Sequence, residues 1–162
     1  YLTEKNKNII VTRTFSKAFG LAGARIGYLV SNRKNVTNLM KVKPYADINI
    51  LAIKSAEVAL DNLGILKKNL IEIKKSKKII KKFCEKRKLK FINTETNFVH
   101  VKFRNFAECK KIFLFLKSKK FLVRINGDGL PATIRSCLRF SLGPRNKTIK
   151  LISLLNKKSN KL

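Results

Sequence analysis

The sequence is poor in residues that build small disulfide-rich or metal-dependent folds. Its 162 residues include no tryptophan, one methionine, one histidine and three cysteines. Cys84, Cys109 and Cys137 are widely spaced without a C-x-x-C pair, so we expect no disulfide framework and no metal site. Each cysteine is predicted to be a small buried apolar residue. The single histidine, His100, lies in an alternating run, NFVHVKF, and is predicted to be a structural strand residue.

Acidic residues are also scarce. Nine Asp and Glu stand against 38 Lys and Arg, which gives a formal net charge of +29. Charge alone would indicate a nucleic-acid-binding module. The lysines, however, run along the whole chain, and in residues 67–88 they alternate with apolar residues at helical spacing, as on the wet face of an amphipathic helix. Because Lys, Ile, Asn and Phe are abundant together, an A/T-rich genome explains the bias, and a nucleic-acid partner is the less favoured alternative.

Long hydrophobic runs are missing as well. The apolar runs are shorter than a membrane span, and the opening YLTEKNKN is too polar for a signal peptide. With 44% hydrophobic residues the composition is that of a globular protein, and the length suits one domain or two small lobes. We therefore expect a cytoplasmic protein without a membrane segment.

Hydrophobic periodicity predicts two short strands and two helices in the first third of the chain. The strands are expected at Asn8–Arg13, which is apolar enough to be buried, and at Arg25–Val30. Helices are expected at Asn35–Val42, ended by Pro44, and at Ile50–Asn62, with Gly64 breaking the pattern.

The rest of the chain predicts one long helix followed by a small lobe. Apolar spacing gives a helix over Ile65–Lys88 that is long enough to bridge two lobes. The elements after it follow the order strand, strand, helix, strand, strand, helix, which suits an α+β lobe. They are expected at Leu89–Ile92, Phe98–Phe103, Phe106–Lys117, Phe121–Arg124, Cys137–Leu142 and Asn146–Leu155, with a turn at Asn126–Gly129.

The segment Thr14–Tyr28, TFSKAFGLAGARIGY, carries the most informative chemistry. Two hydroxyls and Lys17 follow the first strand, and a glycine-containing stretch leads on to Arg25. Glycine lets the backbone approach a ligand closely, and hydroxyls with a guanidinium suit a phosphate group. We expect Lys17, facing such a cradle from an apolar loop, to be partly desolvated and nucleophilic. The alternative is one more surface lysine.

The same segment resembles the active-site lysine segment of the fold type I pyridoxal-phosphate (PLP) enzymes, most closely the histidinol-phosphate aminotransferase family. The family pattern S-K-x-F-G-L-A-G-x-R-x-G-Y is matched here by SKAFGLAGARIGY. The resemblance implies that Lys17 is the catalytic residue that forms the Schiff base with pyridoxal 5'-phosphate. It also implies that Thr14, Ser16 and Arg25 bind the cofactor phosphate.

The resemblance extends to the end of the chain. Thr96–Val99 is similar to the family's T/A-N-F segment, Leu122–Arg124 to its L-V-R strand, and Cys137–Gly143 to its L-R-I-T-V-G segment. By this match Arg139 binds the substrate carboxylate, and Arg124 is a second substrate contact. A buried arginine in an apolar strand would in any case need an anionic partner.

The implied fold is α/β, with part of a PLP-transferase large domain joined by a long helix to a small α+β C-terminal domain. Residues 1–64 would belong to the large domain, 65–88 to the linking helix and 89–162 to the small domain. The family's pyridinium-binding Asp, its ring-stacking aromatic residue and its phosphate loop lie upstream of this pattern. We therefore expect an incomplete, inactive fragment of an enzyme that is a homodimer at full length and acts on a small phosphorylated or polar amino compound.

The substrate and the reaction remain open. Pro44–Asn49, PYADIN, departs from the P-Y-N-x-N of histidinol-phosphate enzymes and is similar to the P-x-x-E-I-N of relatives from surface-polysaccharide and phosphonate gene clusters. The first alternative is a PLP-dependent decarboxylase of a phosphorylated amino acid on the same fold. The others are the basic nucleic-acid-binding module and an inactive remnant.

Overall fold

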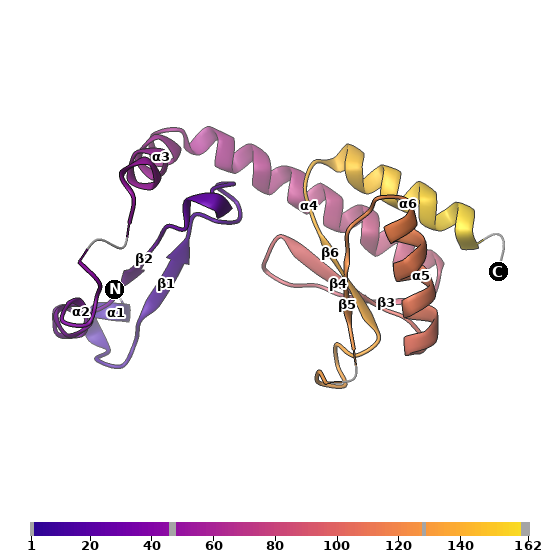
Figure 1. The fold of residues 1–162 in the computed structure, drawn as a ribbon, viewed down its shortest axis with the longest axis horizontal. Coiled ribbons are helices and arrows are strands. Elements are labelled where there is room, and N and C mark those ends of the chain that lie inside the picture. The colour runs from indigo at the N-terminus through magenta and orange to yellow at the C-terminus, as the bar shows by residue number, and fades with distance from the viewer. Residues whose placement is uncertain (1, 46–47, 128, 160–162) are drawn as a thin grey trace. The chain divides into compact units, whose positions relative to one another are not determined.

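The computed structural model describes residues 2–45, 48–127 and 129–159, and it divides the chain into two compact units. Unit 1 is residues 1–67 and unit 2 is residues 68–162. Helices and short strands are mixed along the chain, as Figure 1 shows, so the α/β class is confirmed. The boundary between the units falls inside the long helix α4 (Leu63–Lys86).

Unit 1 contains a two-stranded antiparallel sheet and short helices. Thr14 at the end of β1 lies opposite Gly27 at the start of β2, and Val11 lies opposite Val30. Both predicted strands are present but shorter than expected. The elements are α1 (Leu2–Lys5), β1 (Val11–Thr14), a 3-10 turn η1 (Ala22–Ala24), β2 (Gly27–Val30), α2 (Arg33–Met40) and α3 (Ile50–Asp61).

Asparagine side chains set the helix boundaries of unit 1. Asn32 and Asn49 cap α2 and α3, accepting hydrogen bonds from the backbone N–H groups of Asn35 and Ala52 at 3.0 and 2.8 Å. Helix α3 ends at Asn62, whose backbone N–H donates to the carbonyl of Val58. The predicted break at Gly64 is therefore wrong: the chain turns at Asn62, and Gly64 lies within α4.

Unit 1 has little core of its own. The prediction of a buried first strand is wrong, because Thr12, Arg13 and Thr14 are exposed and Val11 is only half-buried. In β2, Tyr28, Leu29 and Val30 are 50%, 39% and 45% exposed.

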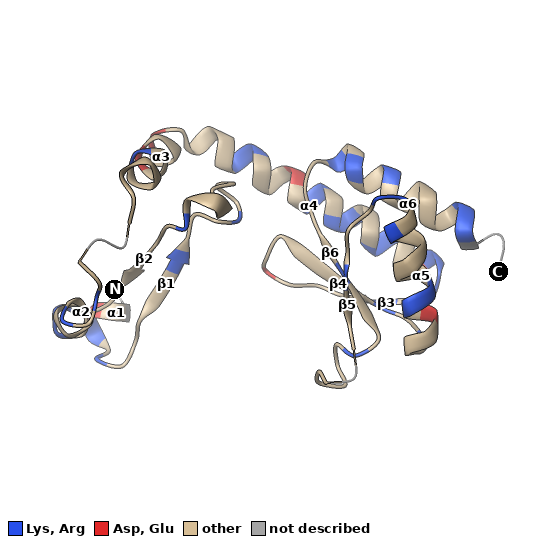
Figure 2. Ribbon diagram, in the orientation of Figure 1, with Lys and Arg blue, Asp and Glu red and all other residues tan. Residues whose placement is uncertain are grey.

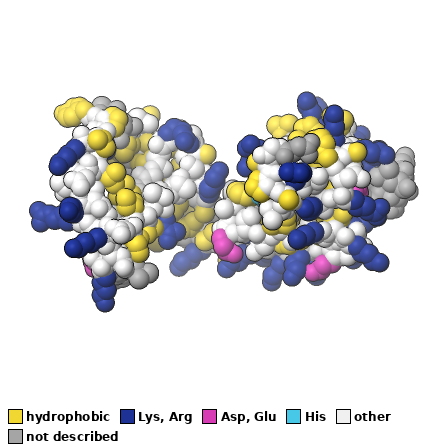
Figure 3. All heavy atoms as spheres, turned by 90° about the horizontal axis from the view of Figure 1, so that it is seen from below, with side chains coloured by type: hydrophobic (Ala, Val, Ile, Leu, Met, Phe, Trp, Pro, Cys, Tyr) yellow, Lys and Arg dark blue, Asp and Glu magenta, His cyan; other side chains and the backbone are white. Residues whose placement is uncertain are grey.

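Hydrophobic side chains lie open on the surface of unit 1 (Figure 3). Residues of the loop before β2, of α3 and of α4 line a groove of about 650 Å³. Unit 1 therefore leaves apolar surface that further protein would have to cover.

Unit 2 is built on a four-stranded antiparallel sheet in the order β3-β4-β6-β5. The predicted sequence of strands and helices is confirmed, except that β5 begins three residues later than expected, at Arg124. Asp128 of the predicted turn lies outside the described residues. The elements are β3 (Lys90–Ile92), β4 (Phe98–Lys102), α5 (Phe106–Ser118), β5 (Arg124–Asn126), β6 (Cys137–Ser141) and α6 (Arg145–Ser159).

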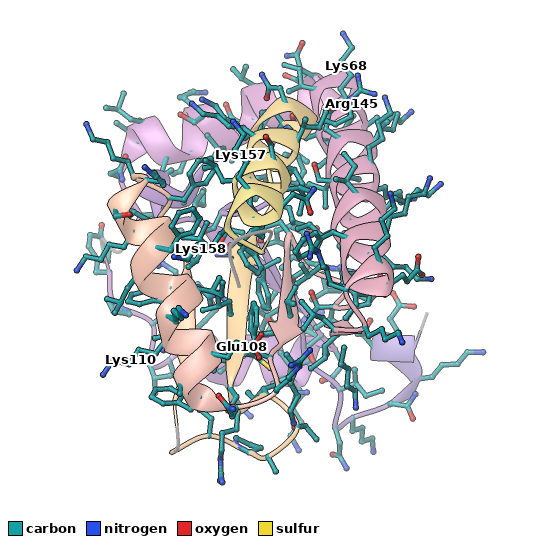
Figure 4. The ribbon with its side chains drawn as sticks, turned by 90° about the vertical axis from the view of Figure 1, so that its right-hand side faces the viewer. Lys68, Glu108, Lys110, Arg145, Lys157 and Lys158 are labelled. Carbon is teal, nitrogen blue, oxygen red and sulfur yellow. The ribbon has the colours of Figure 1, made fainter. Side chains whose placement is uncertain are left out.

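One face of this sheet forms the core of unit 2. Val99 pairs with Phe140 and Val101 with Leu138, and all four side chains are at most 2% exposed. They pack against α4, α5 and α6, which cover the same face of the sheet (Figure 4). Because side chains alternate along a strand, the residues between them lie on the opposite face.

The three cysteines are buried, as predicted. Cys84 of α4, Cys109 of α5 and Cys137 of β6 are each 0% exposed. Burial raises the pKa of Cys84 and of Cys109 to about 12 and also raises that of Cys137. These thiols therefore stay protonated at neutral pH and act as small apolar side chains.

The lysines of α4 lie on its outer side, as the amphipathic pattern predicts. The helix buries Ser76, Ile80, Phe83 and Cys84, and most of its lysines are exposed. Figure 2 shows how the positions of Lys and Arg recur along the helix. The apolar residues of its first turns, such as Ile65 at 62% exposure, are not buried. No helix in the described part of the chain has the length and apolar character needed to cross a membrane.

The core of unit 2 predicts a clear contrast between two leucines. Leu138 is 0% exposed and Leu122 is 90% exposed. Leu138→Ala should lower the free energy of unfolding of unit 2 by roughly 2–5 kcal/mol, because a cavity replaces packed side-chain atoms. Leu122→Ala should change it by less than about 0.5 kcal/mol. Denaturant unfolding followed by circular dichroism measures both, and equal effects would contradict the assigned core.

Candidate active site

The lysine-bearing loop is closed by the strand pair of unit 1. Beyond the Thr14–Gly27 pair, the backbone N–H of Phe15 donates to the carbonyl of Ile26 at 3.3 Å. Phe15 is 4% exposed, and its ring lies 4.9 Å from that of Phe19 and 5.9 Å from that of Tyr28. This aromatic anchor fixes both ends of the loop and brings the residues after β1 beside those before β2.

Local hydrogen bonds shape the first part of the loop. The backbone N–H of Ser16 donates to Thr14 Oγ1 at 3.1 Å, so the two hydroxyl residues form one turn. The N–H of Gly20 donates to the carbonyl of Lys17 at 3.0 Å, and the N–H of Leu21 donates to that of Phe15 at 3.0 Å. Gly20 has a φ of 76°, which a residue with a side chain rarely adopts. Lys17 thus projects from a tight turn.

Arg25 lies at the other end of the loop, in a left-handed conformation with φ 52° that ends the 3-10 turn. Its Nη1 donates to the carbonyl of Ala22 at 3.0 Å. The Phe15–Ile26 hydrogen bond therefore sets Arg25 across the loop from Ser16 and Lys17. Thr14, Ser16, Lys17 and Arg25 thus lie at the end of β1 and along the loop that this closure defines.

The expected desolvation of Lys17 is wrong for the described chain. Lys17, Thr14 and Arg25 are all exposed, and Ser16 is half-buried. The physical reason is the thin cover of unit 1: α3 contacts the 3-10 turn of the loop, but Lys17 itself stays exposed. The amine is therefore open to solvent and to small molecules.

Arg139 and Arg124, the predicted substrate residues, lie side by side in unit 2. They are opposite each other in the β5–β6 pair, on the sheet face away from the core. The Arg139 guanidinium carbon lies 5.0 Å from the centre of the Phe98 ring. In the described residues neither arginine pairs with a carboxylate, and the buried Arg139 Nε has no hydrogen-bond partner. Two arginines on one face of a sheet, without a carboxylate partner among the described residues, suit an anionic ligand.

Sequence reasoning missed the neighbours of Arg139. His100 is in a strand and buried, as predicted, but it is also the residue opposite Arg139 in the β4–β6 pair. Phe98 lies on the same face, because it is two residues away on β4. The position of His100 and Phe98 beside Arg139 follows from the pairing of β4 with β6, and a single sequence does not specify that pairing. Residues 46 and 47 of the PYADIN segment lie outside the described residues.

Solved structures with the same fold support the class of protein. The histidinol-phosphate aminotransferase of Sinorhizobium meliloti in complex with pyridoxal-5'-phosphate is 30% identical with a TM-score of 0.80, over 91% of this chain and 40% of that one. The L-threonine-O-3-phosphate decarboxylase of Porphyromonas gingivalis, at 22% identity and a TM-score of 0.73 over 98% of this chain and 49% of that one, shares the fold.

Sequence comparison identifies the family. The family model of aminotransferase class I and II matches residues 1–153, and the chain belongs to this family. The histidinol-phosphate aminotransferase of Buchnera aphidicola is 34% identical over 164 residues, which cover 96% of this chain and 44% of the relative. The chain therefore spans less than half the length of the relatives it matches. The roles of Lys17, Thr14, Ser16, Arg25, Arg124 and Arg139 stay predictions.

The loop closure gives a prediction at Gly27. A Cβ at this position would lie 2.5 Å from the carbonyl oxygen of Arg13, whereas one at Gly23 would meet nothing within 4 Å. Gly27→Ala should push the two strands apart at a cost of about 1–3 kcal/mol. Amide exchange at Phe15 should then speed up roughly tenfold or more, while Gly23→Ala leaves it unchanged. Unaltered exchange in Gly27→Ala would show that the Thr14–Gly27 register is not what closes the loop.

Proposed function

We propose that this chain is the lysine-bearing and substrate-binding part of a PLP-dependent aminotransferase that acts on a small amino compound with a phosphate or another anionic group. The single observation that carries the proposal is the loop that holds Lys17 between the Thr14–Ser16 turn and Arg25. The family membership and the named relatives support it.

The residues of the loop fit the cofactor. Pyridoxal 5'-phosphate needs a primary amine for its aldehyde and donors for its phosphate. Lys17 supplies the amine. Thr14, Ser16 and Arg25 supply hydroxyl and guanidinium donors at the ends of the same loop, and they are exposed or half-buried rather than enclosed. Bound there, the cofactor would supply an electron sink for the carbanion formed at the substrate Cα.

Each residue then has a defined task. Lys17 Nζ would hold the cofactor by its aldehyde, and the same amine, when free, would move a proton to and from the substrate Cα. Arg25 and the two hydroxyls would hold the phosphate group. Arg139 and Arg124 fix the substrate anion and thereby choose which bond at Cα is broken.

The wider setting follows from the same proposal. Residues 1–64 would belong to the PLP-binding large domain, 65–88 to the linking helix and 89–162 to the small domain. We infer a homodimer in the cytoplasm for the full-length enzyme. The exposed apolar residues of unit 1 support the need for more protein around Lys17 before turnover.

A decarboxylase of a phosphorylated amino acid is the second candidate. It is favoured by the fold shared with the Porphyromonas gingivalis enzyme. Because Arg139 would hold the substrate anion in either reaction, the two reactions differ in which bond at the substrate Cα is broken. Product analysis of an active full-length form separates them: a keto compound indicates transamination, and carbon dioxide with an amine indicates decarboxylation.

The proposal predicts where the cofactor becomes attached. The chain is incubated with a small excess of pyridoxal 5'-phosphate, reduced with borohydride and mapped by peptide mass spectrometry. Lys17 should carry more label than any other lysine, because the proposed phosphate donors lie on the same loop. Lys17→Ala should lose this label, and the control Lys34→Ala, an exposed lysine of α2, should keep it. Equal labelling of the exposed lysines would contradict the proposal.

A further inference from the structure

His100 belongs to a row of nitrogen-bearing side chains across three strands of unit 2. It lies opposite Arg139 in the β4–β6 pair, and Arg139 lies opposite Arg124 in the β5–β6 pair. Directly opposed residues of antiparallel strands share a face of the sheet. This is the face away from the core, because the neighbours Val99 and Phe140 point into the core.

The contacts of His100 tie it to the guanidinium group of Arg139. The rings of His100 and Phe98 meet edge to face at 5.5 Å between centroids, and the Arg139 guanidinium carbon lies 5.0 Å from the centre of the same Phe98 ring. His100 is only 9% exposed. In the described chain its Nδ1 and the Nε of Arg139 are buried without a hydrogen-bond partner. Such atoms normally find a partner, and none comes from the protein here.

The surroundings of this row are positive. On β4, Lys102 shares the face and donates from Nζ to the carbonyl of Ala132 at 2.8 Å. On β3, the residue opposite His100 is Ile92 and the residue opposite Lys102 is Lys90. The remaining titratable group of this face on β6 is the buried thiol of Cys137. The carboxylate of Glu95, in the loop before β4, is exposed to solvent. No carboxylate neutralises the arginines in the described part of the chain.

These surroundings disfavour the charged form of His100. Burial, together with the positive charge of Arg139, lowers the pKa of His100 from its ordinary value. An anion bound at Arg139 would offset that positive charge and make protonation of His100 easier. Linkage requires the reverse effect as well: protonation of His100 must strengthen anion binding by the same factor.

We propose that His100 is a positioning and specificity residue of the anion site at Arg139 and Arg124, which takes up a proton when a doubly charged anion binds. His100 and Phe98 hold the guanidinium in place, and the proton taken up adds a charge that a dianion uses better than a monoanion does. The site therefore selects phosphate monoesters over single carboxylates, and more so as the pH falls. Only the identification of the anion as substrate rests on the proposed function.

The test uses His100 as its own probe, because it is the only histidine of the chain. The imidazole proton resonances of the full chain are followed against pH in sulfate, which stays doubly charged over the range, and in acetate or chloride at matched ionic strength. Saturating sulfate should raise the titration midpoint of His100 by about one pH unit or more, while acetate changes it little. Sulfate should then bind about tenfold more tightly at acid pH than at alkaline pH.

Two variants distinguish specific sulfate binding at Arg139 from general ionic screening of the charged chain. Arg139→Gln should abolish the sulfate-induced shift, whereas Arg145→Gln, which removes an exposed arginine at the start of α6 (Figure 4), should retain it. Where Arg139→Gln does not fold, Arg139→Lys should keep the His100 midpoint in chloride and weaken sulfate binding, because the forked donor is lost. His100→Gln should bind sulfate without the pH dependence.

Two outcomes would overturn the inference: the same His100 midpoint in sulfate and in chloride, or an equal loss of the shift in Arg139→Gln and Arg145→Gln. Neither outcome depends on a cofactor. A sulfate shift without specific labelling of Lys17 would leave the anion site standing and remove the proposed function. Labelling of Lys17 without the sulfate-induced shift would leave the proposed function standing and remove the anion site.

Discussion

The closure of the loop between β1 and β2 is the constraint on which the candidate active site depends. One backbone hydrogen bond, from Phe15 to Ile26, and the pairing of Thr14 with Gly27 bring the two ends of the loop together. Without this closure, a lysine and an arginine separated along the chain would have no fixed relation. With it, Ser16, Lys17 and Arg25 lie on one closed loop, although the unit that carries them has little core.

Unit 2, in contrast to unit 1, has a well-packed core. Its sheet is covered on one face by three helices, so the strands are rigid and the alternation of side chains is enforced. That alternation gives the other face a row of His100, Arg139 and Arg124, and no carboxylate of the described residues neutralises this row. Guanidinium groups left unpaired beside a buried histidine lower the stability of the fold. Such an arrangement is typical of a binding surface rather than of a purely structural one.

Much of this arrangement could be predicted from the sequence. The loop pattern around Lys17 and the apolar spacing of the later helices predicted the elements, because both depend on local periodicity and turn chemistry. Burial of the first strand and desolvation of Lys17 were predicted wrongly, since both depend on what packs over a segment. The relation of His100 to Arg139 could not be predicted either, because strand pairing is a long-range property that alternation alone does not specify.

Phosphorus NMR of the reduced, covalently attached cofactor tests most directly whether the loop of Lys17 is a phosphate site. If Arg25 and the hydroxyls of Thr14 and Ser16 hold the phosphate as a dianion, they should lower its second pKa. The phosphorus resonance should then titrate well below pH 6, which is about the usual second pKa of a phosphate monoester. Arg25→Gln should then restore ordinary titration. A phosphate that titrates in the unaltered chain as it does in free phosphopyridoxyl-lysine would contradict the assignment of this loop as the cofactor site.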